Sequence, residues 1–351
     1  MYLDDYLYKQ DIEYLNNLKI DWKRLEDKGV LIIGATGMIG TVLVDALMER
    51  NIKRNSRIRV YAMGRTKKRA QERFADYLQR PEFTFLSGDI NEGLDLNKRV
   101  DYIFYCASNT HPRAYAADPI GTILTNVLGT NNMLKYAADK RCERVLFLSS
   151  VEIYGENLGT EAFRERDCGY IDCNTVRAGY PEGKRVGEAL CQAYRAQYDL
   201  DIVIPRICRV YGPTMLESDS KALAQFIRNA VRRENIVLKS DGSQYFSYCY
   251  AADVVSALLY SLLYGENGEA YNIADEGSNI CLKELAKLLA DKSGVQIAFE
   301  LPDAVEKQGF SKATKAVLDS GKIKELGWKP ACSIQEGLDR TIDILRNAAR
   351  I

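Results

Sequence analysis

Short apolar runs separated by longer amphipathic stretches are the main pattern of the sequence from residue 29 onward. The apolar runs predict strands at residues 30–33, 57–62, 83–86, 102–105, 145–148 and 201–205. The amphipathic stretches predict helices at residues 41–49, 122–140, 181–198, 219–233, 251–264 and 281–293. Strands that alternate with helices are typical of a doubly wound parallel sheet with helices on both faces. The pattern therefore predicts an α/β protein.

The same pattern divides the chain into three parts. Residues 1–28 place apolar side chains between charged ones ahead of the first strand, which indicates an N-terminal helical extension. Residues 29–205 carry the regular alternation of strands and helices. This alternation loosens after Gly212 and Pro213. We therefore expect residues 206–351 to form mainly a smaller α/β domain, interleaved with the first.

Composition argues against several classes of function. The 351 residues include 48 Lys and Arg against 48 Asp and Glu, a balance that argues against a nucleic-acid partner. No apolar run approaches the roughly 20 residues of a membrane helix, so we expect no membrane partner. Nine scattered cysteines, without a C-x-x-C pair or a recognisable signal peptide, predict a cytoplasmic protein with reduced thiols. A single histidine, His111, excludes a multi-histidine metal centre, and we expect no metal.

Three glycines directly follow the first predicted strand. Gly34, Gly37 and Gly40 form a G-x-x-G-x-x-G segment that opens a helix. Glycine lets the backbone turn tightly, approach a pyrophosphate, and pack helix against strand, while the helix N-terminus offers unpaired N–H groups. The setting predicts a dinucleotide site in a Rossmann-like domain spanning residues 29–205.

The choice between NAD and NADP depends on the end of the second strand. An acidic residue there would bind the ribose hydroxyls of NAD, but the chain has Arg65, followed by Lys67 and Lys68. These basic residues favour NADP, through a 2′-phosphate, and leave NAD open; a solvated helix start is an equal alternative.

A serine, a tyrosine and a lysine form the candidate catalytic set. Tyr180 and Lys184 are spaced by four residues, which places both on one face of a helix. A nearby ammonium favours the phenolate, so we expect the pKa of Tyr180 to fall and its phenol to act as acid and base. Ser150, which follows a buried strand 30 residues earlier, supplies a hydroxyl for the reacting oxygen.

Together these motifs resemble the short-chain dehydrogenase/reductases in their extended form, the NAD-dependent epimerase/dehydratase family. Asn126 opens the family's N-x-x-G-T segment, and residues 319–338 resemble its closing pattern. Among its members the chain looks most similar to UDP-glucuronate decarboxylases, in segments that include residues 118–126, 177–185, 211–215 and 241–244. The resemblance therefore implies an enzyme that transiently oxidises a nucleotide sugar at C4 with a bound nicotinamide cofactor.

The resemblance also assigns roles to individual residues. It implies a catalytic set of Ser150, Glu152, Tyr180 and Lys184. It implies cofactor contacts from Gly34, Thr36, Gly37, Met38, Ile39, Gly40, Arg65, Asp89, Ile90, Ala107, Ser108, Asn126, Tyr180 and Lys184. It implies substrate contacts from His111, Arg113, Arg209, Lys239 and Gln244.

Glu152 narrows the reaction within the family. The family's decarboxylases and dehydratases have Glu at this position, where a proton at C5 must be managed, whereas plain 4-epimerases have a small residue. Dehydratases also carry an acid just before it, and here that residue is Val151. Decarboxylation is thus favoured. An epimerase acting at C4, C3 or C5, a 4,6-dehydratase, a Glu152 that only orders its loop, and a non-catalytic dinucleotide-binding protein remain alternatives.

Two substitutions relative to the family concern the substrate phosphates. Phe246 stands where relatives have an arginine for these phosphates, and Arg209 stands where they have an asparagine. We therefore expect the Arg209 guanidinium to replace the missing one, with Arg206 in a structural role.

The family's homodimers pair two helices from each subunit, and the helices at residues 122–140 and 180–198 resemble that pair. The resemblance implies an interface made by Ile123, Val127, Met133, Leu190, Ala193 and Tyr194.

Overall fold

The computed structural model describes residues 2–110, 112–157, 159, 161–301 and 313–348. A parallel sheet of eight strands is its largest element, in the order β11-β7-β5-β4-β1-β2-β3, with β6 also beside β7. Its strands are β1 (Gly29–Ile33), β2 (Arg59–Gly64), β3 (Phe83–Ser87), β4 (Tyr102–Tyr105), β5 (Arg144–Phe147), β6 (Ser149–Ser150), β7 (Ile202–Ile207) and β11 (Ala270–Ile273). The predicted α/β fold with a doubly wound parallel sheet is confirmed.

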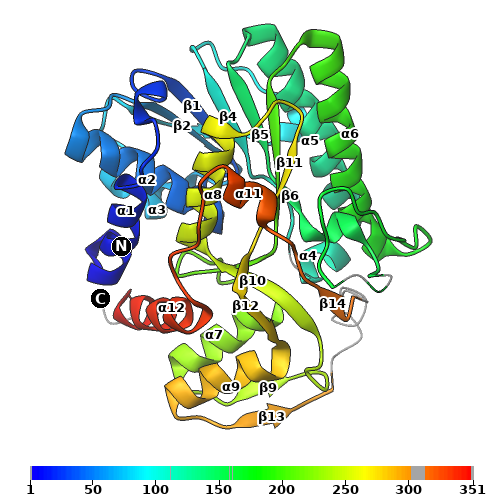
Figure 1. Cartoon of the computed structure of the whole chain (residues 1–351). Helices are drawn as coiled ribbons and strands as arrows, with labels where there is room; N and C mark the ends of the chain where they lie inside the picture. Colours follow the sequence, from blue (N-terminus) through cyan, green and yellow to red (C-terminus); the bar gives the residue numbers. More distant parts are fainter. Residues whose placement is uncertain (1, 111, 158, 160, 302–312, 349–351) are drawn as a thin grey trace.

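Both faces of the sheet are covered by helices, which explains the unbroken apolar strands (Figure 1). Val30 and Ile32 of β1 belong to a hydrophobic cluster that includes the inner faces of α2 and α8. Leu31 and Ile33 point to the opposite cluster, which contains residues of α5 and α6. The helices around the sheet are α1 (Tyr6–Asn16), α2 (Met38–Arg54), α3 (Lys67–Arg73), α4 (Pro112–Ala117), α5 (Pro119–Lys140), α6 (Gly179–Tyr198) and α8 (Ala251–Tyr264).

A second, smaller body lies at the carboxyl edge of the sheet (Figure 1). Strands β8, β10, β12 and β14 form a mixed sheet, and β9 pairs with β13. Its elements are β8 (Arg209–Tyr211), α7 (Ala222–Arg232), β9 (Ile236–Leu238), β10 (Tyr245–Tyr250), β12 (Asp275–Cys281), α9 (Leu282–Ser293), β13 (Ile297–Phe299), β14 (Lys315–Ala316) and α12 (Ile334–Ala348). Helix α11 (Gly321–Glu325) packs instead against the edge strand β11 of the main sheet (Figure 1).

The chain passes between the two bodies more than once. Strand β7 continues to Ile207, past the predicted boundary at residue 205. Helix α8 and strand β11 then return from the C-terminal half, α8 packing against β5 and β7 while β11 pairs with β7. The two bodies are therefore joined by several crossings instead of a single linker.

The N-terminal helix α1 packs against elements of both bodies. Tyr8 of α1 donates a hydrogen bond from its hydroxyl to Asp45 of α2, at 2.6 Å. Asp11 accepts hydrogen bonds from Tyr250 at 2.5 Å and from Arg340 of α12 at 2.7 Å. Helix α1 therefore connects helix α2 of the larger body with the C-terminal helix α12. Among the described residues, no helix is both long and apolar enough to cross a membrane.

Candidate active site

The glycine segment lies where the strand order reverses, at the carboxyl ends of β1 and β4. Gly34 has a φ of +86°, and a Cβ atom there would lie 2.8 Å from the Ala107 nitrogen, in the loop after β4. A Cβ atom on Gly40 would lie 2.4 Å from the Gly34 oxygen. Because these distances are too short for a Cβ atom, only glycine fits at positions 34 and 40. In open α/β sheets, ligands usually bind in the crevice at the point where the strand order reverses.

The N-terminus of α2 faces the same crevice. The helix begins at Met38, and its N-cap residue, Gly37, has no side chain to bond the first backbone N–H groups. These donors suit a pyrophosphate. The residues present therefore fit the phosphates of a dinucleotide.

Other predicted cofactor residues surround this crevice. Thr36 lies beside Gly64 at the end of β2, so the exposed Arg65 follows at the rim. The Asp89 carboxylate accepts a hydrogen bond from the Asn91 backbone at 2.9 Å, and Ile90 is buried. The Asn126 amide oxygen accepts a hydrogen bond from the Ser108 hydroxyl at 3.1 Å, which joins α5 to the loop after β4. Their contacts with a cofactor stay a prediction.

Two elements carry the candidate catalytic groups. Ser150 ends β6, and its hydroxyl accepts a hydrogen bond from the Glu152 backbone at 3.3 Å. Tyr180 and Lys184 lie one turn apart near the start of α6, and both are buried. The Lys184 ammonium donates to the Leu148 carbonyl at 2.7 Å. Burial lowers the pKa of Lys184 from 10.5 to about 8.

Tyr180 titrates differently from the sequence-based expectation. Burial raises its pKa to about 12, and a hydrogen bond with Ser150 only partly opposes this. The expected fall of the pKa is therefore wrong for the protein chain by itself. The physical reason is that the phenolate would lose its hydration in the cleft, and desolvation outweighs the neighbouring groups.

A stack of side chains connects Tyr180 with Glu152. The rings of Tyr115 and Tyr180 lie 5.1 Å apart, and the Arg177 guanidinium lies 4.7 Å from the centre of the Tyr115 ring. Arg177 Nη2 forms an ion pair with Glu152 Oε2 at 2.6 Å. Glu152 is therefore held beside Tyr180, and its charge is compensated.

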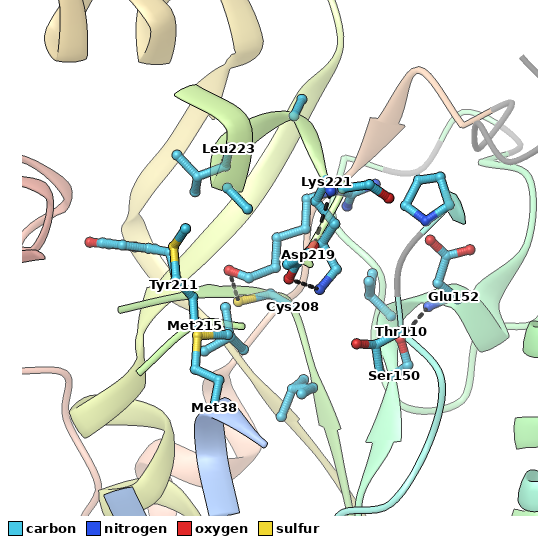
Figure 2. A pocket seen from close by; sticks show the side chains of 18 of the residues that line it. Met38, Thr110, Ser150, Glu152, Cys208, Tyr211, Met215, Asp219, Lys221 and Leu223 are labelled. Carbon is cyan, nitrogen blue, oxygen red and sulfur yellow. Dashed lines mark hydrogen bonds and ion pairs between the residues drawn. The ribbon is translucent and has the colours of Figure 1, made fainter. Parts of the chain in front are cut away.

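One cleft of about 380 Å³ contains most of the predicted site. In Figure 2, Ser150 and Glu152 lie on one side and Met38, Tyr211 and Met215 on the other, from different elements. The predicted residues that line this cleft are Gly34, Gly37, Met38, Ile39, Gly40, Ser108, Ser150, Glu152, Tyr180, Lys184, Arg209, Lys239 and Gln244. Thr36, Arg65, Asp89, Ile90, Ala107, Asn126 and Arg113 do not line it.

The predicted substrate residue Arg113 stands apart from this group. Arg113 is exposed on α4, and its backbone N–H donates to the Ser220 hydroxyl at 3.1 Å. His111 lies outside the described residues.

The exchanged pair Arg209 and Phe246 is brought into direct contact. The Arg209 guanidinium carbon lies 3.3 Å from the centre of the Phe246 ring, on the neighbouring parallel strands β8 and β10. Within the described part of the chain, Arg209 Nη1 is buried without a hydrogen-bond partner. Arg206 instead forms an ion pair with Glu188 at 2.6 Å and donates to Tyr154 and to the Glu165 carbonyl. This geometry agrees with a structural role for Arg206.

The sequence analysis did not single out several residues of the cleft wall. They include Tyr115 and Arg177. They also include Asp219 and Lys221, two neighbouring residues of one segment that form an ion pair at 3.1 Å (Figure 2). Arg177 stood three residues before Tyr180, but neither periodicity nor a motif connected it with Glu152. In the described ranges, no group of three or more His, Cys, Asp or Glu residues could hold a metal ion.

Comparison with known proteins identifies the family to which the chain belongs. The model for the NAD-dependent epimerase/dehydratase family matches residues 30–274. UDP-glucuronic acid decarboxylase 3 of Arabidopsis thaliana is 33% identical over 311 residues, which cover 88% of this chain and 86% of that protein. UDP-glucuronic acid decarboxylase 1 of Xenopus tropicalis is 32% identical over 326 residues, which cover 91% of this chain and 72% of that protein.

A solved structure agrees with the sequence comparison. The dTDP-glucose 4,6-dehydratase of Streptomyces venezuelae, solved with NAD bound, is 25% identical, with a TM-score of 0.78. The alignment covers 91% of this chain and 97% of that one. The chain therefore belongs to the NAD-dependent epimerase/dehydratase family and is a homologue of enzymes that act on nucleotide sugars.

Proposed function

We propose that this protein removes the carboxylate of UDP-glucuronate as CO2, with a bound nicotinamide dinucleotide that is regenerated in each turnover. The observation that supports this most is the pairing of Glu152 with the Ser150, Tyr180 and Lys184 set in one cleft. Homology to UDP-glucuronic acid decarboxylases over 88% of the chain supports the substrate.

The cofactor would be held by the glycine segment and by the loop after β4. Gly34, Gly37 and the N-terminus of α2 would hold the pyrophosphate, and Lys184 would hold the nicotinamide ribose. When bound, the cofactor would supply a reversible hydride acceptor for sugar carbon C4, and the positive charge of its oxidised ring would favour the phenolate of Tyr180. Arg65 favours NADP, whereas the solved relative holds NAD, so the choice between them stays a prediction.

The residues of the chain would handle the protons. Tyr180 takes the proton of the C4 hydroxyl, and the Ser150 hydroxyl donates a hydrogen bond to the same oxygen. The resulting 4-keto group lies β to the carboxylate. When the bond from C5 to the carboxylate breaks, its electron pair therefore delocalises onto the C4 oxygen as CO2 leaves. Glu152 governs the proton that returns to C5, and Tyr180 returns its proton to the C4 oxygen when the carbonyl is reduced.

The nucleotide half of the substrate would be held across the cleft. We infer that Arg209 binds the diphosphate, because it is buried in the cleft wall with a donor that has no partner in the described chain. Lys239 and Gln244, from the segment that precedes β10, lie where they would contact the rest of the nucleotide. Arg113 and His111 stay weaker predictions for the sugar.

We further infer a homodimer. The exposed apolar side chains Ile120, Ile123, Leu124 and Leu128 of α5 lie on the helix pair that the family resemblance implicates. Met133 does not belong to this surface, because it is fully buried against the sheet of its own chain, and its assignment to the interface was wrong.

A cytoplasmic location stays a prediction from the nine free cysteines.

The proposed activity is tested by incubating the protein with NAD and UDP-glucuronate, followed by mass spectrometry. Release of CO2 together with a UDP-pentose is expected. An epimerised or dehydrated product from UDP-glucuronate, UDP-glucose or UDP-galactose would replace this proposal by one of the alternatives.

Tyr180→Phe should lower turnover by about 100-fold or more while the thermal unfolding temperature stays close to that of wild type. Near-normal turnover in this variant would contradict the mechanism.

A further inference from the structure

Arg177 has more hydrogen-bonding capacity than the protein uses. A guanidinium carries five N–H donors, and Nη2 of Arg177 is engaged by Glu152 at 2.6 Å. Its Nε and Nη1 atoms are buried, and neither has a hydrogen-bond partner among the described residues. Buried donors without partners are costly, so a built site that retains them is expected to satisfy them with a ligand.

The Arg177 side chain forms part of the cleft wall next to the proposed acid/base Tyr180. Arg177 packs on Tyr115, which in turn packs on the proposed acid/base Tyr180, and all three side chains line the cleft. The Arg177 side chain retains 15% exposure, so it lies at the wall of the cleft. Glu152 is neutralised by the same guanidinium, so this wall does not repel an anion.

The cleft holds a second guanidinium with a spare donor. Arg209 lies against Phe246, and its Nη1 atom also lacks a partner among the described residues. Burial lowers the pKa of Arg209, and the charge of the nearby Arg177 adds a smaller decrease in the same direction. Two like charges with unused donors in one cleft are best stabilised by two anionic groups on the ligand. A UDP-hexuronate carries both a diphosphate and a carboxylate, whereas a UDP-hexose carries only the diphosphate.

We propose that Arg177 binds the carboxylate of the sugar and thereby selects nucleotide-activated hexuronates over neutral hexoses. The inference rests on the proposed function and adds to it the residue that recognises the group to be lost. In the bound state the guanidinium is shared between Glu152 and the substrate carboxylate, and its stacking on Tyr115 fixes its plane.

Binding measurements test this inference without turnover. The Tyr180→Phe protein, loaded with NAD, is titrated with UDP-glucuronate and with UDP-glucose by calorimetry, and the ratio of the two dissociation constants is the readout. Adding Arg177→Met should lower the preference for UDP-glucuronate by about 10- to 100-fold, with UDP-glucose affinity within about threefold. Arg177→Lys should retain part of the preference. Arg164→Met is the control, because Arg164 is exposed, pairs with Asp319 and does not line the cleft.

A double variant separates contact from neutralisation. Arg177→Met leaves Glu152 uncompensated, which by itself would repel a carboxylate. If Arg177 contacts the substrate, the Arg177→Met, Glu152→Gln protein still lacks the preference. If the preference returns in the double variant, or is unchanged in Arg177→Met, the inference is wrong. Its failure differs from failure of the proposed function, in which wild-type protein releases no CO2 from UDP-glucuronate.

Discussion

Burial governs the chemistry of the catalytic side chains at the scale of single residues. It raises the pKa of Tyr180 to about 12 and lowers that of Lys184 to about 8, so both groups favour their neutral forms more than free side chains do. The buried site therefore favours a neutral phenol and an ammonium that is easily deprotonated. The proposed bound cofactor, with its positive ring, would shift Tyr180 back towards phenolate.

Lys184 should make stability depend on pH. Its folded-state pKa of about 8 lies below the ordinary 10.5, so the folded protein binds fewer protons than the unfolded chain between these values. The free energy of unfolding of wild type, relative to Lys184→Met, should therefore rise by up to about 3 kcal/mol as the pH increases from 8 to 10.5. Below pH 8 the difference should stay constant. Urea unfolding across this range measures it, and parallel curves for the two proteins would contradict the assignment.

Arg209 should determine affinity for the nucleotide sugar. Truncating a charged donor costs about 1.5–3 kcal/mol, so Arg209→Ala should weaken UDP-glucuronate binding roughly 10- to 150-fold. Cofactor affinity should not change, because the glycine segment lies elsewhere in the cleft. Calorimetry with NAD and with the nucleotide sugar measures both.

A swap variant provides the control for Arg209. Arg209→Asn combined with Phe246→Arg produces the arrangement that the family resemblance implies and should recover much of the lost affinity. If Arg209→Ala alone binds the nucleotide sugar normally, then Arg209 does not contact the diphosphate, and Phe246 indicates a different class of substrate.

At the scale of helices and strands, the long apolar and amphipathic segments were predictable because both faces of the main sheet are buried. The predicted strand at 102–105 and the predicted helix at 251–264 have the observed bounds. Strands β8 and β12 were not predicted, because their pairing depends on partners such as β10 that are distant in sequence. The pair Arg177 and Glu152 was also beyond prediction, since 25 residues separate its members.

Helices α5 and α6 should carry the contact between two copies of the chain. Leu124 is 42% exposed on α5, and a charge there would be buried in the proposed dimer. Leu124→Glu should therefore convert a dimer into a monomer at micromolar concentration, as measured by sedimentation velocity. Ile52→Glu on α2 is the matched control, because Ile52 is equally exposed but lies on another helix. A wild-type protein that sediments as a monomer would remove the proposal.

For the molecule as a whole, helix α1 joins parts that are remote in sequence. Asp11 is buried between Tyr250 of β10 and Arg340 of α12, so it ties the first helix to both halves of the smaller body. The same helix is bound to α2 of the larger body by the hydrogen bond from Tyr8 to Asp45. The relative position of the two bodies, and thus the shape of the cleft between them, depends in part on this helix.

Breaking the Asp11–Arg340 pair should cost much more than breaking a surface pair. Arg340→Met leaves a buried carboxylate without its cation and should lower the free energy of unfolding by about 3 kcal/mol. Adding Asp11→Asn removes that unpaired charge and should recover part of the loss. Lys292→Met, which breaks a more exposed pair with Asp339, should cost less than about 1 kcal/mol. Equal losses for Arg340→Met and Lys292→Met in urea unfolding would contradict this account.

Helix α1 is synthesised well before its polar partner Arg340, which lies 329 positions later in the chain than Asp11. Its apolar face can meet α2 early in synthesis, but Asp11 has no cation to pair with until α12 has emerged. The polar docking of α1 is thus completed only after α12 has been synthesised. A chain truncated before α12 would therefore keep the Asp11 carboxylate without its cation, and α1 would be held only by its remaining contacts, chiefly those with α2.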